Sequence, residues 1–244
     1  MENNFYSDDQ LYPWMKTNFN RLLLRAHNNK LPNAFLIEGK SGLGKIALAR
    51  QFAKKLLCTD SALGGPACDI CNHCHWFNAT THPDFTQINP AEKSHVIKVD
   101  QIRYLNDRIA LKSHGEKYKI VIIAPAESMN INAANSLLKT LEEPTPNVLL
   151  ILISSHPNRL PATVKSRCQV RVMDIPLREV ALEWLNSNGT QAKVSEHVLM
   201  ALRLSFGAPV LAQTYLQDGV VERYHTQFKQ FLLFNTKPLS VVDV

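Results

Sequence analysis

The chain has 244 residues, of which 45% are hydrophobic and 20% are charged, and its formal net charge is +6. This balance excludes a largely disordered chain, and the length allows one large domain with a core plus a smaller one. No apolar run reaches transmembrane length, and residues 1–9 lack the basic and apolar regions of a signal peptide, so we expect a cytoplasmic protein. The basic excess is compatible with a nucleic-acid or acidic partner, and equally with a basic soluble protein that binds neither.

The first predicted elements are a helix over residues 12–28 and a strand over residues 34–37. The segment Leu31-Pro32-Asn33 separates them, and the leucines at 22–24 are expected to supply the apolar face of the helix. The strand leads into the glycine-rich stretch G-K-S-G-L-G-K-I at 39–46, which a predicted helix over 47–53 follows. Strand, glycine-rich loop and helix in this order are the context of a phosphate-binding P-loop.

The P-loop departs from the working motif at its last position. Backbone N–H groups at the helix start can hold phosphate, and Lys45 can reach the β and γ phosphates. A working P-loop then has Ser or Thr, whose hydroxyl ligates Mg²⁺, whereas this chain has Ile46. A glycine-rich turn can also serve backbone packing alone, so the pattern leaves nucleotide binding undecided. We expect weak or absent binding of ATP or ADP at a degenerate site formed by Gly39, Gly42, Gly44, Lys45 and Ile46.

Four of the five cysteines lie within seventeen residues, with the spacing C-x9-C-x2-C-x2-C: Cys58, Cys68, Cys71 and Cys74. In a reducing compartment, clustered cysteines indicate a metal before a disulfide. Four thiolates suit tetrahedral Zn²⁺ and leave no open position, so the zinc would be structural. The alternatives are an iron–sulfur cluster, unrelated thiols, or replacement of one ligand by a nearby histidine, His73, His75 or His82.

Strands alternate with helices further along the chain. We predict strands over 83–88, 119–123, 148–153 and 169–172, and helices over 99–112 and 132–143, the second ended by Pro144. This alternation, with apolar strands suited to burial on both faces, predicts a doubly wound parallel α/β domain. After Pro176 only helices are predicted, over 177–185, 195–203 and 209–216, followed by an amphipathic helix over 220–234.

The acidic residues that hold Mg²⁺ and polarise water in P-loop ATPases are missing at their usual place. The strand over 119–123 runs directly into Ala124 and Pro125, which can neither bind metal nor accept a proton. Glu127 is the nearest carboxylate, and we expect it to be a solvated loop acid. Together with Ile46, this loss predicts that the chain does not hydrolyse ATP by itself.

Two further segments are specific to one family. They are N-A-A-N-S-L-L-K-T-L-E-E-P at 132–144 and the Ser-Arg-Cys triplet at 166–168. With the four-cysteine insertion, the degenerate acidic motif and the helical segment after it, the chain resembles the clamp-loader branch of the AAA+ family. Within that branch it is most similar to the delta-prime subunits of bacterial DNA polymerase III, over residues 10–240.

The resemblance implies a function and partners. It implies a stator-like, non-hydrolysing subunit that works with gamma/tau ATPase subunits and delta to load the sliding clamp onto primed DNA. Arg167 of the Ser-Arg-Cys triplet would be an arginine finger supplied in trans to a neighbouring ATPase subunit. Independent catalysis is not expected, although the chain would be a component of a DNA-directed DNA polymerase, a nucleotidyltransferase complex.

The resemblance also implies a domain organisation. We predict an AAA+ P-loop-like α/β domain over 1–175 with a zinc module at 58–74, and a small three-helix lid domain over 176–217. Residues 218–244 would begin a helical collar domain. Family members usually continue further, so we expect this chain to be a truncated one.

Two other functions compete with this interpretation. An active AAA+ clamp-loader ATPase could tolerate Ile46 in a variant P-loop. A zinc-dependent DNA-binding module would require basic and aromatic residues among the cysteines, and residues 68–74 contain none of Lys, Arg, Phe, Trp or Tyr.

Overall fold

The computed structural model describes residues 11–60, 65–91, 94–110, 118–187 and 196–236. The chain divides into two compact units, with the boundary between Asp174 and Ile175. The first unit contains a five-stranded sheet in the order β2-β3-β4-β1-β5, and every pairing in it is parallel. The strands are β1 (Ala34–Glu38), β2 (Phe85–Ile88), β3 (Lys119–Ile123), β4 (Val148–Ser154) and β5 (Gln169–Val172). This arrangement confirms the predicted parallel α/β fold.

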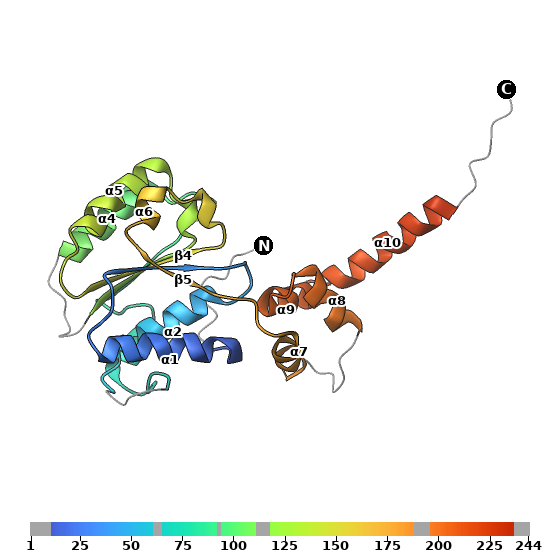
Figure 1. The fold of residues 1–244 in the computed structure, drawn as a ribbon, viewed down its shortest axis with the longest axis horizontal. Helices are drawn as coiled ribbons and strands as arrows, with labels where there is room; N and C mark the ends of the chain where they lie inside the picture. The colour runs from blue at the N-terminus through green and yellow to red at the C-terminus, as the bar shows by residue number, and fades with distance from the viewer. Residues whose placement is uncertain (1–10, 61–64, 92–93, 111–117, 188–195, 237–244) are drawn as a thin grey trace, which may run out of the picture. The chain divides into compact units, whose positions relative to one another are not determined.

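Helices cover both faces of the sheet (Figure 1). Helices α1 (Lys16–His27) and α2 (Lys45–Leu57) lie on one face, and α4 (Val99–Ala110), α5 (Ile131–Glu142) and the short α6 (Ala162–Lys165) lie on the other. Strands β3 and β4 are buried along their whole length, as an apolar run between two helical layers requires. The core on the α4–α5 face joins alternate strand residues to both helices, for example Leu36, Val121, Leu150, Ile102 and Leu137.

Several boundaries differ from those predicted. The N-terminal helix begins at Lys16, after a one-turn 3₁₀ helix, η1 (Pro13–Met15), and β2 begins two residues later than expected. The last two residues of the predicted helix over 99–112 lie outside the described residues. Leu22 is buried and Leu23 half-buried, but Leu24 is 61% exposed, so the predicted apolar face is confirmed at Leu22 and wrong at Leu24. Residues in an α-helix are about 100° apart, and three consecutive leucines therefore cannot share one face.

Short helical turns follow two of the strands and one lies in the cysteine segment. They are η2 (Ala126–Ser128) after β3, η3 (Pro157–Arg159) after β4, and α3 (Asn72–Asn78). None of these three was predicted from the sequence. Helix α5 is capped by the side chain of Asn130, which accepts a hydrogen bond from the Ala133 N–H. These turns position the loops at the two ends of the sheet.

The second unit is helical throughout its described part. Its helices are α7 (Arg178–Ser187), α8 (Glu196–Leu204), α9 (Pro209–Gln217) and α10 (Val220–Thr236). Gly207 precedes α9 with a φ of 84°, a left-handed conformation that favours glycine. The division of this unit into a lid and the start of a collar stays a prediction. Across the described residues of both units, no helix is long and apolar enough to cross a membrane.

Candidate functional site

The P-loop connects the carboxyl end of β1 to the start of α2. Gly42 and Gly44 have φ angles of 78° and 79°, so the loop uses backbone conformations that other residues rarely adopt. A Cβ at Gly44 would also collide with Met15 and come within 2.6 Å of the Tyr12 ring. The η1 segment therefore packs tightly on the start of α2, and the Trp14 indole N–H donates to the Leu43 carbonyl at 3.0 Å. The loop has P-loop geometry, with Ile46 at the position of the missing hydroxyl.

Lys45 is turned back into its own loop. Its ammonium donates to the carbonyls of Gly39 (2.8 Å) and Lys40 (2.7 Å) and to the Ser155 hydroxyl oxygen (2.9 Å). Burial lowers the pKa of Lys45 to about 8, and the nearby carboxylate of Glu127 opposes that shift. The lysine thus has three internal acceptors where a nucleotide would offer phosphate oxygens.

Glu127 is not the solvated loop acid that the sequence suggested. Its side chain is only 8% exposed, and its Oε1 accepts hydrogen bonds from the backbone N–H groups of Ser155 (2.9 Å) and His156 (3.1 Å). Burial raises the pKa of Glu127, but hydrogen bonds from its own backbone and from Ser155 outweigh burial and hold this pKa below its usual value. The turn η2 folds the residue back toward the end of β4, which local sequence could not reveal.

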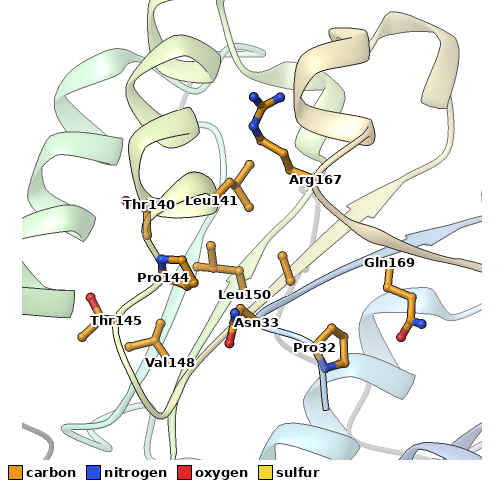
Figure 2. A pocket seen from close by; sticks show the side chains of 11 residues that line it. Pro32, Asn33, Thr140, Leu141, Pro144, Thr145, Val148, Leu150, Arg167 and Gln169 are labelled. Atoms are coloured by element: carbon orange, nitrogen blue, oxygen red, sulfur yellow. The ribbon is translucent and has the colours of Figure 1, made fainter. Parts of the chain in front are cut away.

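Arg167 lies at the amino ends of the strands, whereas the P-loop lies at their carboxyl ends. It borders a cavity of about 220 Å³ whose walls include Pro32 and Asn33, just before β1, and the first residues of β4 and β5 (Figure 2). The P-loop, by contrast, follows the last residue of β1. Five residues of strand separate the two ends, roughly 16 Å at about 3.3 Å per residue. Arg167 is therefore remote from the P-loop of its own chain.

The Arg167 guanidinium is exposed and already paired. It makes an ion pair with Glu142 at the end of α5, with 2.6 Å between Nη2 and Oε1, and donates from Nη1 to the Thr163 carbonyl at 3.0 Å. The arginine side chain is 35% exposed and the glutamate side chain 50%. The adjacent Cys168 points the other way into the core, where burial raises its pKa to about 11. Within the Ser-Arg-Cys triplet, Cys168 is thus anchored in the core and Arg167 is presented to solvent.

The four cysteines come together as predicted. Their sulfurs all lie within 4.8 Å of one another, and among the described residues the group contains no histidine. The distance between Cys58 Sγ and Cys68 Sγ is 3.4 Å, and two other sulfur pairs are 3.9 Å apart. A tetrahedron with metal–sulfur bonds of about 2.3 Å has sulfurs about 3.8 Å apart, so the group can hold a metal ion such as zinc.

Two helix ends position these sulfurs. Cys58 caps the end of α2, Cys71 caps the start of α3, and Cys74 lies in the first turn of α3. Backbone N–H groups donate to the sulfurs, including Asp60 N–H to Cys58 at 3.3 Å and Cys74 N–H to Cys71 at 3.4 Å. Such donors favour the thiolate form that binds metal.

Of the three histidines offered as alternative ligands, His73 and His82 have other partners, and His75 is not part of the four-sulfur group. His73 Nδ1 and His82 Nε2 are 2.9 Å apart and share a hydrogen bond. Burial, followed by the neighbouring His73, lowers the pKa of His82 to about 4, so His82 is neutral at physiological pH. His82 in turn accepts from the Asp84 N–H at 3.1 Å, and this pair helps to join the cysteine segment to β2.

The chain matches known proteins along most of its length. A family model described as DNA polymerase III, delta subunit, matches residues 14–176. A DNA polymerase III subunit delta' from Haemophilus influenzae is 36% identical over 96% of this chain and 71% of its own length. The subunits delta' of Pseudomonas aeruginosa and Escherichia coli are 39% and 32% identical over 87% and 84% of this chain. The chain belongs to the DNA polymerase III delta' family. It spans 63% and 61% of the last two relatives.

Solved structures agree on the AAA+ fold. A DNA polymerase III gamma subunit-related protein from Thermotoga maritima has a TM-score of 0.52 at 18% identity, covering 80% of this chain and 57% of that one. A mutant of RuvB from the same organism has a TM-score of 0.54 at 13% identity, covering 87% and 64%. At these identities the likeness concerns the fold alone.

Sequence reasoning missed three residues of this delta' family member that contact the predicted ones. Ser155 and His156 follow the buried strand β4, and polar residues at the carboxyl end of a central parallel strand are a signal that could have identified them. Glu142, the partner of Arg167, lies within the L-E-E-P segment that identified the family. No local signal pairs it with Arg167, because the two meet only when α5 and α6 pack on the same face of the sheet.

Proposed function

We propose that this chain acts as the stator-like, non-hydrolysing delta' subunit of a DNA polymerase III clamp loader, which helps to load the sliding clamp onto primed DNA. Its partners would be gamma/tau ATPase subunits and delta. The observation on which this proposal chiefly rests is the position of Arg167. Arg167 is exposed at the amino ends of the strands, whereas the P-loop lies at their carboxyl ends. The Arg167 guanidinium is therefore suited to another subunit's nucleotide.

An arginine finger in trans is consistent with the local geometry. The guanidinium is planar and forked, and it matches the oxygens of a transferring phosphoryl group. Such fingers raise the rate by about 10³–10⁵ because they neutralise charge in the transition state. The Glu142 carboxylate would hold Arg167 in the free subunit, and its exposed position would let a phosphate compete for the same guanidinium. Ser166 and Cys168 would help to fix its presentation.

Absence of hydrolysis in the subunit itself has separate support. Ile46, Ala124 and Pro125 provide no ligand for Mg²⁺. Glu127 already accepts two backbone hydrogen bonds, and Lys45 has three acceptors of its own. Binding of ATP or ADP would therefore have to replace existing contacts without help from a metal, and we infer that it is weak or absent.

The four cysteines would hold one structural zinc ion. Four sulfur donors fill a tetrahedral shell and leave no position for water, so the ion would supply folding energy and no chemistry. It would join the end of α2 to the start of α3.

The decisive experiment replaces Arg167 with Ala in a loader reconstituted from gamma/tau, delta and this subunit, with the other fingers removed. We expect clamp-stimulated ATP hydrolysis at the facing gamma/tau site to fall by about 10³ or more, while assembly persists. Arg167→Lys should rescue poorly, because an ammonium lacks the forked geometry. Arg178→Ala, at an exposed arginine on α7, is the matched control. An unchanged rate in Arg167→Ala would refute the trans role.

A further inference from the structure

A cavity of about 370 Å³ lies between α1 and the edge strand β5, and it is lined by none of the residues that line the Arg167 cavity. Three arginines border it, and none of the described residues that line it is acidic. Arg21 and Arg25 are one turn apart on α1, and Arg171 is on β5. We call this cavity the arginine groove. Its lining residues are Asn18, Arg21, Leu22, Leu24, Arg25, Ile37, Leu48, Val170, Arg171, Val172 and Met173.

Arg171 lacks a compensating anion among the described residues. Its Nη2 donates to the neutral side chain of Gln169 at 3.2 Å, and its buried Nε has no hydrogen-bond partner. Burial lowers the pKa of Arg171, and the positive charges of Arg25 and Arg21 lower it further. Three guanidinium groups that repel one another, one of them with an unsatisfied donor, form a site that a carboxylate would stabilise.

The backbone beside the groove is also available for pairing. Strand β5 is at the edge of the sheet and, among the described strands, pairs only with β1. The Met173 N–H donates to the Glu38 carbonyl at 2.7 Å, which directs residues 169, 171 and 173 toward β1. Alternate residues along a strand point their backbone groups to opposite sides, so the N–H groups of Val170 and Val172 point outward. An extended segment can add to such an edge.

The rest of the groove wall is apolar and includes Leu22, Ile37, Leu48 and Met173. An apolar cavity beside three arginines, next to a strand edge that no described strand covers, fits a ligand that has carboxylates, apolar side chains and an extended peptide backbone. A nucleic-acid backbone could satisfy the arginines, but it would use neither the strand edge nor the apolar wall.

We propose that the arginine groove binds an extended acidic and apolar peptide segment of a partner protein, which adds as a strand to β5 and places a carboxylate on Arg171. The proposal does not depend on Arg167 or on nucleotide, so its failure would leave the clamp-loader function untouched.

The test uses a fluorescein-labelled peptide of alternating glutamate and valine, about ten residues long, and measures its affinity for the whole chain by fluorescence anisotropy. Arg171→Ala should weaken binding by about tenfold or more, because a charge-assisted hydrogen bond is lost. The double variant Arg21→Ala/Arg25→Ala should weaken it comparably, and this variant changes only surface positions of α1. Arg103→Ala on α4, which removes one positive charge as Arg171→Ala does, should leave the affinity unchanged.

The strand edge is tested separately at Val172. Val172→Pro removes an outward N–H without removing a bond to β1, and it should weaken binding by roughly fivefold relative to Val172→Ala. Circular dichroism of each variant verifies folding. Wild-type affinity in Arg171→Ala or in the double variant would overturn the proposal, as would equal affinity of Val172→Pro and Val172→Ala. Tighter binding of a labelled oligothymidine of similar length would assign the groove to nucleic acid and also overturn it.

Discussion

Individual residues in this delta' family member owe their chemistry to burial as much as to type. Lys45 and Glu127 are ionisable groups of one buried cluster at the carboxyl ends of the strands, and both have shifted pKa values. Arg167 is exposed at the amino ends of the strands, where it forms an ion pair with Glu142. An exposed ion pair of this kind contributes at most about 1 kcal/mol to stability. Stability therefore depends on the first two residues, whereas the proposed function in trans depends on the third.

Lys45 predicts a dependence of stability on alkaline pH. Its pKa is about 8 in the folded chain and 10.5 ordinarily, so between these values the unfolded chain binds more protons. The contribution of Lys45 to the free energy of unfolding should therefore increase as the pH rises from 8 to 10.5, by up to about 3 kcal/mol. Urea unfolding at several pH values should show this contribution in the wild type and not in Lys45→Met. Lys16→Met, at an exposed position of α1, should keep it; an identical pH slope in all three proteins would contradict the prediction.

Glu127 predicts a structural cost on truncation. Glu127→Ala leaves the partly buried N–H of Ser155 without its acceptor and removes the charge that favours protonated Lys45. We expect a loss of about 1–3 kcal/mol in the free energy of unfolding, measured by urea denaturation. Glu143→Ala, at an exposed glutamate after α5, should change it by less than about 0.5 kcal/mol. Equal effects of the two substitutions would show that Glu127 is a surface acid after all.

At the scale of elements, the ends of helices and strands position the functional groups. Cys58 and Cys71 are at the end of α2 and the start of α3, and the P-loop and η2 follow β1 and β3. The start of a helix offers backbone N–H groups without intrahelical partners, which can donate to sulfur or to phosphate, whereas Cys58 at the end of α2 accepts from the Asp60 and Cys68 N–H groups beyond the helix. The edge strand β5 adds backbone groups of the same kind beside the arginine groove.

The cysteine cluster predicts one zinc ion per chain. Cys71→Ser should abolish stoichiometric zinc in metal analysis of the purified chain, because three thiolates hold the ion less tightly than four. Hydrogen exchange should then become faster in residues 65–78, since binding and local folding are coupled. Cys168→Ala, at the cysteine outside the cluster, should retain zinc, and hydrogen exchange in residues 65–78 should stay as slow as in the wild type. Wild-type protein that contains iron with sulfide, or no metal, would exclude the structural zinc.

At the scale of the whole molecule, the P-loop and Arg167 lie at opposite ends of the strands of one parallel sheet, and the proposed function between neighbouring subunits depends on this separation. Under the proposed function, Arg167 would serve the nucleotide site of a neighbouring subunit, while the P-loop of this chain would hydrolyse nothing. The helical unit from Ile175 onward is a separate compact body.

The purified chain should hydrolyse no ATP above background, with or without Mg²⁺. The physical reason is the absence of an oxygen ligand at Ile46 and of carboxylates at Ala124 and Pro125, which leaves the metal and the attacking water unplaced. A coupled phosphate-release assay measures the rate, and Lys45→Ala is the matched control. Turnover that disappears in Lys45→Ala would identify an active ATPase with a variant P-loop.

Residue identity and spacing determined much of this protein without a structure. Ile46 lacks a hydroxyl in any fold, and overlapping C-x2-C steps bring sulfurs together because a few residues of chain cannot separate them far. The parallel α/β fold followed from the alternation of apolar runs and helical patterns. The tertiary structure alone decided that the Glu127 side chain is buried, that Arg167 pairs with Glu142, and that Arg171 lines the same cavity as Arg21 and Arg25. These contacts depend on which strands become neighbours and which helices share a face, and long-range packing, not local sequence, specifies that order.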